Sequence, residues 1–427
     1  MREILLLIAI IAGLGMTFRT PFVGVLIWEW FTLQNPHRET YGFMGSTNMV
    51  IAVVTLIAWA MARSERKAPP NGLILWAIVI FIAWTTLDTF FAYDPGWSFG
   101  YWDRTWKTFA LGILLAATVT NRVRAQAVVW VAVVSLFYYG VKGGLFTIVT
   151  GGHNHVLGPS GSMINDNNQL AVAMLMTLPL ANFLRGQSAD KRVRLALLGG
   201  TILTVIAVIG TYSRGALIGL AALGFLGLLR MKRRLTYMTV AAVLIAFTVH
   251  FMPEQYFERM STMNSVESVQ ADESVHGRLV AWQVAYYAAK DRFPFGAGFY
   301  GPQLAPFFHA YFPNEKNHAA HSIYFQVLGE HGFIGLAIYL MMILASFIRV
   351  SYIIRAARRV PEKRWAAELG VALQASLIVF CVSGAALSLA YYDLFVIVIC
   401  LLLPLWPMVR PDQTRAAFRP VPITATG

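Results

Sequence analysis

Charged residues are scarce in this 427-residue chain: 13% are Asp, Glu, Lys or Arg, whereas 57% are hydrophobic. A soluble domain usually carries about 25% charged residues. The apolar residues form blocks roughly 20 residues long, which is the length that crosses a bilayer core. The positive mean hydropathy of +0.58 agrees with this pattern. The sequence therefore excludes an ordinary soluble domain and predicts an all-α polytopic membrane protein.

Cysteines and metal-ligand patterns are also rare. The two cysteines, Cys381 and Cys400, lie in apolar segments, so neither a disulfide framework nor a zinc site is predicted. The chain has no Asp-x-Asp pair, and its histidines lack the spacing of zinc ligands. It also lacks a P-loop and a dinucleotide-binding fingerprint. We therefore expect neither a metal ion nor a cofactor.

Acidic residues are outnumbered, 21 against 34 basic residues, which gives a net charge of +13. In a soluble protein this balance would suggest nucleic acid. Here the basic residues form short clusters between apolar blocks, as in the cytoplasmic loops of membrane proteins. We therefore expect no nucleic-acid partner, and a bacterial inner membrane location with the C-terminus in the cytoplasm. The clusters lie at 63–67, 121–124, 191–194, 232–234 and 358–364.

About twelve membrane passes are predicted from the apolar blocks. The first is interrupted by Arg19-Thr20-Pro21, because proline breaks helical hydrogen bonding. Residues 1–250 would hold the first nine or ten helices, 321–410 the C-terminal ones, and 411–427 a cytoplasmic tail. The predicted passes are 2–32, 44–62, 72–91, 104–120, 125–149, 165–184, 195–212, 214–230, 235–251, 322–348, 365–388 and 390–409.

Residues 251–320 form the one large loop that this topology places in the periplasm. The loop is polar, rich in aromatic residues, and contains three of the nine histidines, with a fourth, His321, directly after it. Its spacing predicts a short amphipathic helix over Pro253–Met260 and a longer helix over Ser274–Asp291, with Trp282 and Tyr286 on one face. A turn follows at 293–299, where glycine and proline gather. A loop of this size is where an extracytoplasmic site would be built.

Two arginines on the predicted outer side are candidates for binding phosphate. Arg214 lies in a tight turn between two apolar segments, and Arg278 lies in the large loop. A charge near the membrane is costly, so such residues often serve function. The planar guanidinium matches phosphate oxygens in pairs, and two of them would form a diphosphate clamp. The alternatives are a snorkelling arginine at 214 and a solvated surface arginine at 278.

His321 is a candidate general base. It lies where the outer loop re-enters the membrane, and an imidazole can take a proton from an attacking hydroxyl near neutral pH. The alternative is an interfacial histidine satisfied by backbone groups.

Weaker candidates for substrate binding lie on the same predicted side. Asp166 and Asn168 would form either a helix N-cap cluster or a sugar-binding patch. An aromatic residue such as Trp282 suits the apolar face of a sugar ring, although it would also fit an interfacial aromatic belt. The remaining candidates are Lys107, which could assist a phosphate together with Arg104, and Tyr392 and Asp393 between the last two segments.

Three blocks in order resemble the O-antigen ligase/polymerase superfamily, over roughly residues 150–400. They are Ser213-Arg214-Gly215, then Arg278 with Trp282 and the turn at Gly296-Ala297-Gly298, then His321 through Gly335. In addition, the stretch 21–38 is similar to a subgroup named for O-glycosylation ligases.

The resemblance implies a membrane-embedded glycosyltransferase with a periplasmic active site. The donor would be a glycan on undecaprenyl diphosphate, and for an O-antigen ligase the acceptor would be lipid A-core. The family's arginines correspond to Arg214 and Arg278 and its histidine to His321, while a late acidic residue corresponds loosely to Asp393. Together with the residue chemistry this suggests an inverting, metal-independent transfer. Membrane lipids would surround the protein.

Other functions stay open. A polymerase or a protein O-oligosaccharyltransferase of the same superfamily would use the same chemistry on a different acceptor. A lipid-linked sugar transporter would share the arginines, but it would need paired gates and charges at mid-membrane. The candidate polar residues instead gather on one face, which favours the enzyme.

Overall fold

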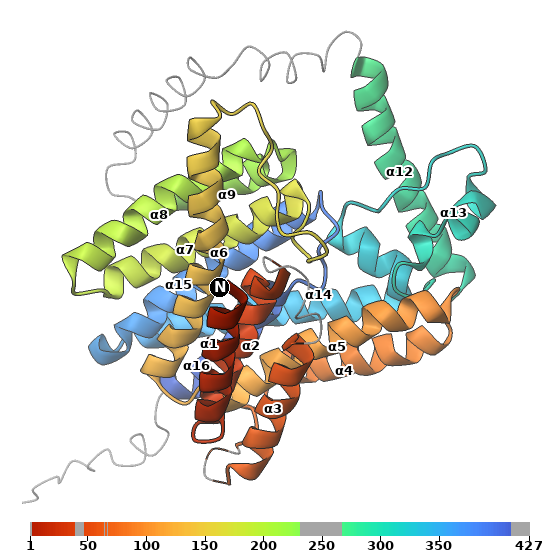
Figure 1. Ribbon diagram of the computed structural model, residues 1–427. Coiled ribbons are helices and arrows are strands. Elements are labelled where there is room, and N and C mark those ends of the chain that lie inside the picture. The colour runs from red at the N-terminus through yellow and green to blue at the C-terminus, as the bar shows by residue number, and fades with distance from the viewer. Residues whose placement is uncertain (1, 39–46, 64, 66, 231–266, 411–427) are drawn as a thin grey trace, which may run out of the picture.

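The computed structural model describes residues 2–38, 47–63, 65, 67–230 and 267–410, and within these ranges the chain is helical with no strand (Figure 1). This confirms the all-α class. The α-helices are α1 Arg2–Thr17, α2 Pro21–Gln34, α3 Thr47–Met61, α4 Leu73–Phe90, α5 Pro95–Thr118, α6 Arg122–Val149, α7 Asn167–Gln187, α8 Lys191–Gly210, α9 Arg214–Arg230, α12 Glu267–Asp291, α13 Ala305–Tyr311, α14 Ile323–Arg358, α15 Arg364–Gly384 and α16 Asp393–Val409.

Five stretches among the described residues are long and apolar enough to cross a membrane: Leu73–Phe90, Arg122–Val149, Lys191–Gly210, Ile323–Arg358 and Pro361–Gly384. Shorter apolar helices accompany them. Together they identify a membrane protein, while the count of twelve passes, the periplasmic side of the loop and the cytoplasmic C-terminus stay predictions. Several sequence-based expectations lie outside the described residues, namely the pass at 235–251, the helix at Pro253–Met260, the cluster at 232–234 and the tail at 411–427.

The first apolar block is broken where the sequence predicts it. Helix α1 ends at Thr17 and α2 begins at Pro21, which occupies the first turn of α2. Proline is suited to that position because its missing N–H would have no helical partner there. The two helices pack against each other (Figure 1). The break therefore yields a pair of short helices rather than one long pass.

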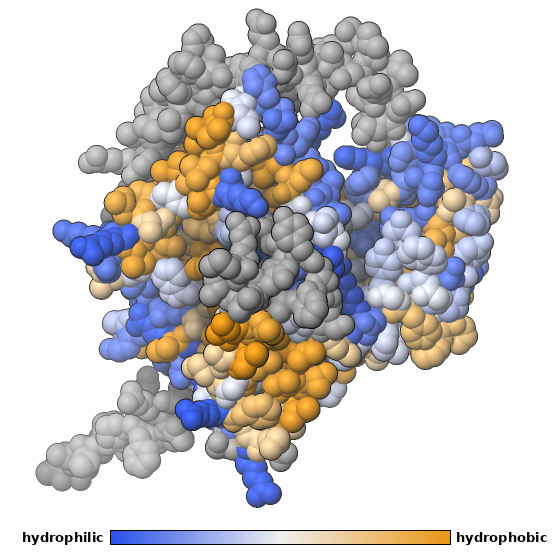
Figure 2. All heavy atoms as spheres, viewed as in Figure 1, coloured by the Kyte–Doolittle hydropathy of each residue, from blue (hydrophilic) through white to orange (hydrophobic). Residues whose placement is uncertain are grey.

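The centre of the molecule is formed by α7 and α16, whose residues are buried on nearly all sides. Helix α7 packs against α15, and α16 packs against α5 and α14. The periphery, in contrast, exposes large apolar side chains, among them Leu7 and Ile8 of α1 and Leu195 of α8. Hydrophobic residues gather over the region of α1 to α3 in Figure 2. An apolar exterior around a packed interior is what a lipid environment requires.

Helices α12 and α13 form a separate, more polar region with a small core of their own around Val284 and Phe308 (Figures 1 and 2). Trp282 of α12 stacks on Phe325 of α14, with ring centroids 4.6 Å apart. Tyr286, one turn later, meets Phe333 of the same helix at 6.0 Å. The predicted shared face is therefore confirmed, and it is the face by which α12 packs on α14.

Helix α14 is interrupted at Gly332, whose φ of 70° and ψ of −174° are not helical. The interruption leaves carbonyl groups of the preceding turn without helical partners. The N–H groups of Ala297 and Gly298 donate to the carbonyls of Gly329 and Glu330, each at 2.9 Å. The turn predicted at 293–299 is thus present, and it is attached to the kink in α14.

Candidate functional site

A tight turn positions Arg214 at the start of α9. Tyr212 has a positive φ of 56°, and the side chain of Ser213 accepts a hydrogen bond from the backbone N–H of Ala216 at 3.2 Å. This is the contact of a helix N-cap. Asn167 of α7 donates to the carbonyl of Thr211 at 2.7 Å and so fixes the turn from the other side. Arg214 itself is exposed.

Arg278 projects from α12 and is half-buried. Its neighbour Gly277 allows a close approach of His318, because an added Cβ there would lie 2.9 Å from that ring. The pKa of Arg278 is lowered, first by burial and then by the positive charge of Arg214. The second cause shows that the two guanidinium groups, 64 positions apart in the chain (278 − 214), share one electrostatic environment.

His321 completes this cluster from the loop that leads into α14. Its φ of 45° lies in the left-handed region, which costs a non-glycine residue about 1–3 kcal/mol. Burial lowers the pKa of His321, the charge of Arg278 lowers it further, and the carboxylate of Asp166 opposes them. A pKa below the ordinary value leaves the imidazole neutral and able to accept a proton at neutral pH.

Three of the weaker candidates lie around this cluster. Asp166 caps α7 and accepts hydrogen bonds from the backbone and side-chain nitrogens of Asn168, at 2.8 and 2.9 Å. Both alternatives for this pair therefore stay open, since Asp166 is an N-cap and also faces His321 electrostatically. The indole of Trp282 donates to the carbonyl of Ala320 at 2.7 Å, so it supports the backbone just before His321.

Asp393 and Arg104 belong to a second group. Asp393 is buried at the start of α16, accepts a hydrogen bond from Thr108 at 2.6 Å and interacts with Arg104. Arg104 also interacts electrostatically with Arg38. The guanidinium of Arg38 donates to the carbonyl of Ser160 at 3.2 Å. The segment joining α6 to α7 therefore takes part in both groups, because it contains Ser160 and leads to the Asp166 that faces His321.

No described contact places Lys107 or Tyr392 at the arginine and histidine cluster. Lys107 forms an ion pair with Asp103 on its own helix at 2.6 Å. Tyr392 is buried, and its hydroxyl has no hydrogen-bond partner among the described residues. Within the described part of the chain, no three His, Cys, Asp or Glu side chains gather in a way that would hold a metal ion.

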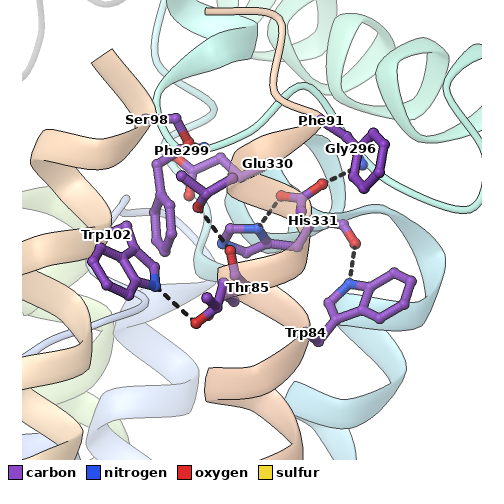
Figure 3. A network of polar contacts seen from close by, with 12 residues as sticks. Trp84, Thr85, Phe91, Ser98, Trp102, Gly296, Phe299, Glu330 and His331 are labelled. Carbon is purple, nitrogen blue, oxygen red and sulfur yellow. Dashed lines mark hydrogen bonds and ion pairs between the residues drawn. The ribbon is translucent and has the colours of Figure 1, made fainter. Parts of the chain in front are cut away.

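A buried polar network around the kink in α14 was missed by the sequence analysis (Figure 3). The Nδ1 atom of His331 lies 2.7 Å from a carboxylate oxygen of Asp88, and both side chains are fully buried. The other oxygen of Asp88 accepts from the N–H of Gly296 at 3.1 Å. Glu330 accepts from the N–H of Tyr300 at 3.1 Å and from the hydroxyl of Tyr391 at 2.5 Å.

The network ties α4, the turn after α12, the kink in α14 and the start of α16 to one another. A signal for it exists in the sequence, since Asp88, Glu330 and His331 are ionisable residues within apolar blocks. Sequence spacing does not reveal that they meet, because Asp88 lies 243 residues from His331.

Residues 199–340 match the family model described as O-antigen ligase. This match identifies residues 199–340 as a domain of the O-antigen ligase/polymerase superfamily. Residues 1–189 match a family of unknown function, and none of the curated proteins matches the chain. Membership indicates an enzyme of glycosyltransferase type.

The match to the O-antigen ligase family covers the whole arginine and histidine cluster, because Arg214, Arg278 and His321 all lie within residues 199–340. Asp166, Asn168 and Lys107 lie in the N-terminal match, and Asp393 lies beyond both. This superfamily member therefore adds groups from outside the matched ligase region to the surroundings of its candidate site.

Proposed function

We propose that this protein transfers a glycan from undecaprenyl diphosphate to lipid A-core at the periplasmic face of the bacterial inner membrane, as an O-antigen ligase. The observation that carries the proposal is the electrostatic coupling of Arg214 to Arg278 and of Arg278 to His321. Two guanidinium groups that share one environment repel each other, and a bound diphosphate would relieve this repulsion. His321, the proposed base, would then lie beside the diphosphate leaving group.

The N-terminus of α9 adds to this arrangement. Arg214 is the first residue of that helix, where the backbone N–H groups and the helix dipole favour an anion. The helix end and the two arginines would therefore stabilise the negative charge that grows on the departing diphosphate.

The reaction would be a single displacement. His321 takes the proton of an acceptor hydroxyl, and the hydroxyl oxygen attacks the anomeric carbon of the glycan. The bond from that carbon to the diphosphate oxygen breaks, and its electron pair leaves with undecaprenyl diphosphate into the bilayer. One displacement inverts the configuration. The arginines supply positive charge that a divalent ion would otherwise provide, so activity is expected to be unchanged by a chelator.

Exposed aromatic rings near the second group suit the glycan. Tyr300 stacks on Tyr101 at 5.2 Å and on Trp97 at 5.6 Å, and Trp97 and Tyr101 are exposed. Tyr101 also interacts with Arg104, the partner of Asp393. A sugar ring could lie against the outer faces of these rings while its lipid diphosphate reaches the arginines.

The experiment that tests the proposal is transfer by the purified protein in nanodiscs. The donor is a glycan on undecaprenyl diphosphate, the acceptor is either lipid A-core or a second lipid-linked unit, and the product is identified by mass spectrometry. We expect transfer to lipid A-core. Product on the lipid-linked unit alone would instead assign a polymerase, and donor movement without transfer would assign a transporter.

Two variants test the roles of the site residues. His321→Ala should abolish transfer while donor binding is retained, because the base is removed and the clamp is not. Arg214→Lys should lower kcat about 10²-fold, because a point charge does not reproduce a bidentate contact. Arg122→Lys serves as the control, since Arg122 is exposed and bonded to Gln187 away from the cluster. Near-normal turnover by either site variant would contradict its assigned role.

A further inference from the structure

A cavity of about 320 Å³ lies between α4, α14 and α16, away from the candidate active site. Its walls are apolar or aromatic, and among the described lining residues Arg349 alone is charged. Three lining side chains, Leu73, Ile348 and Tyr352, are about half exposed at the surface. The cavity therefore opens sideways, toward the lipid.

The cavity lies at the opposite end of the helices from the site. On α14, Arg349 follows the kink at Gly332 by 17 residues, which is about 26 Å along a helix. On α4 the cavity residue Leu73 begins the helix, whereas Asp88 of the network near the site lies at its end. A bilayer core is about 30 Å thick. The cavity thus faces the leaflet opposite to His321, which is the cytoplasmic leaflet in the proposed topology.

Arg349 carries a charge that no described neighbour neutralises. It is half-buried, and among the described residues no carboxylate forms an ion pair with it. Its guanidinium lies over the ring of Trp406 at 5.4 Å, and an added Cβ on Gly72 would lie 2.7 Å from it. The adjoining first turn of α4 contains no acidic residue. An aromatic ring orients the cation but leaves its hydrogen-bond donors available.

We propose that this cavity binds one anionic phospholipid, with its phosphate on Arg349 and an acyl chain against the apolar walls. The guanidinium fork matches phosphate oxygens, and an arginine near the headgroup region of an anionic leaflet attracts such lipids. The sideways opening admits a lipid tail, whereas free inorganic phosphate would leave the apolar walls without a binding partner. This site is separate from the donor site because it faces the opposite leaflet.

The test is retention of lipid by the full chain, measured by native mass spectrometry after delipidation and incubation with phosphatidylglycerol. We expect wild type to retain phosphatidylglycerol more strongly than phosphatidylethanolamine, and Arg349→Gln to retain about tenfold less. Arg355→Gln is the matched control, because Arg355 is an exposed arginine on the same helix that does not line the cavity.

A second variant keeps the test decisive if Arg349→Gln misfolds. Ile348→Trp retains the arginine but fills the cavity mouth from an exposed position, and it should also lose the lipid. Equal retention of both lipids by wild type, unchanged retention by either cavity variant, or displacement of the lipid by millimolar inorganic phosphate would overturn the proposal. Because the readout is lipid binding, its outcome does not depend on glycan transfer.

Discussion

At the scale of single residues, the charges around His321 oppose one another. Arg278 disfavours the protonated imidazole, while Asp166 favours it, and burial adds to the effect of the arginine. The balance lowers the pKa of His321 and leaves a neutral ring facing two guanidinium groups. A neutral ring does not add to their repulsion in the absence of substrate, and it can still take a proton once a diphosphate is bound.

Replacing Asp166 with asparagine tests this balance. Asparagine keeps the N-cap of α7 but removes the negative charge, so the pKa of His321 should fall further. Activity is lost when the base becomes protonated, and the acid limb of kcat/KM should therefore move to lower pH. The measurement is a pH profile of transfer. Asp103→Asn, which removes an exposed carboxylate paired with Lys107, should leave the limb in place; a limb that moves upward in Asp166→Asn would refute the assignment.

At the scale of elements, the kink in α14 is what allows the turn after α12 to attach. The carbonyls that Gly332 frees are taken by Ala297, Gly298 and the indole of Trp84, which donates to His331 at 3.0 Å. Buried carbonyl groups require such partners. Since α12 carries Arg278 and α14 follows His321, the kink fixes the relation between two of the three cluster residues.

Gly332→Ala should destabilise the attachment of the turn after α12 to the kink in α14. The backbone conformation at 332 is one that essentially only glycine adopts, and an added Cβ would lie 2.6 Å from the carbonyl oxygen of Phe295. We expect the free energy of unfolding to fall by about 2 kcal/mol or more, measured by denaturation in detergent micelles. Gly199→Ala in α8, where nothing lies within 4 Å, should be neutral or slightly stabilising. Equal effects of the two changes would mean that the kink is not constrained.

At the scale of the whole molecule, one fully buried carboxylate joins parts of the chain that are far apart. Asp88 contacts His331 of α14 and Gly296 of the turn after α12, more than 200 residues away in both cases. Figure 3 shows His331 and Gly296 close to Glu330 and Phe299 in one place. The membrane helices and the polar α12 region are thereby held as one unit.

Asp88→Ala should weaken the attachment of the α12 region to the membrane helices. Removing one partner of a buried pair leaves the other unsatisfied, at a cost of about 3–5 kcal/mol. Amide hydrogen exchange at residues 296–300 should accelerate together with the loss of stability. Asp103→Ala removes an ion pair whose carboxylate is 53% exposed, and it should change stability by no more than about 1 kcal/mol. A turn that stays protected in Asp88→Ala would show that other contacts suffice to hold it.

Much of this organisation follows from the sequence. Helix α9 has the bounds that the apolar block predicts, and the break before Pro21 and the turn at 293–299 fall where proline and glycine place them. These features are local, since they depend on residues within one or two turns of each other. The three candidate catalytic residues were also named from the sequence, through their chemistry and the resemblance of their three blocks to the superfamily, and their catalytic roles stay predictions.

The sequence by itself determined the helical membrane class and the residues of the candidate site, because apolar length and side-chain chemistry are properties of short segments. Only the tertiary structure decided that Arg214 lies near Arg278, that Asp166 faces His321, and that Asp88 meets His331. Such contacts depend on how helices pack, and many packings satisfy the same local pattern. The lone charge of Arg349 in its cavity likewise appears only when three distant helices are placed side by side.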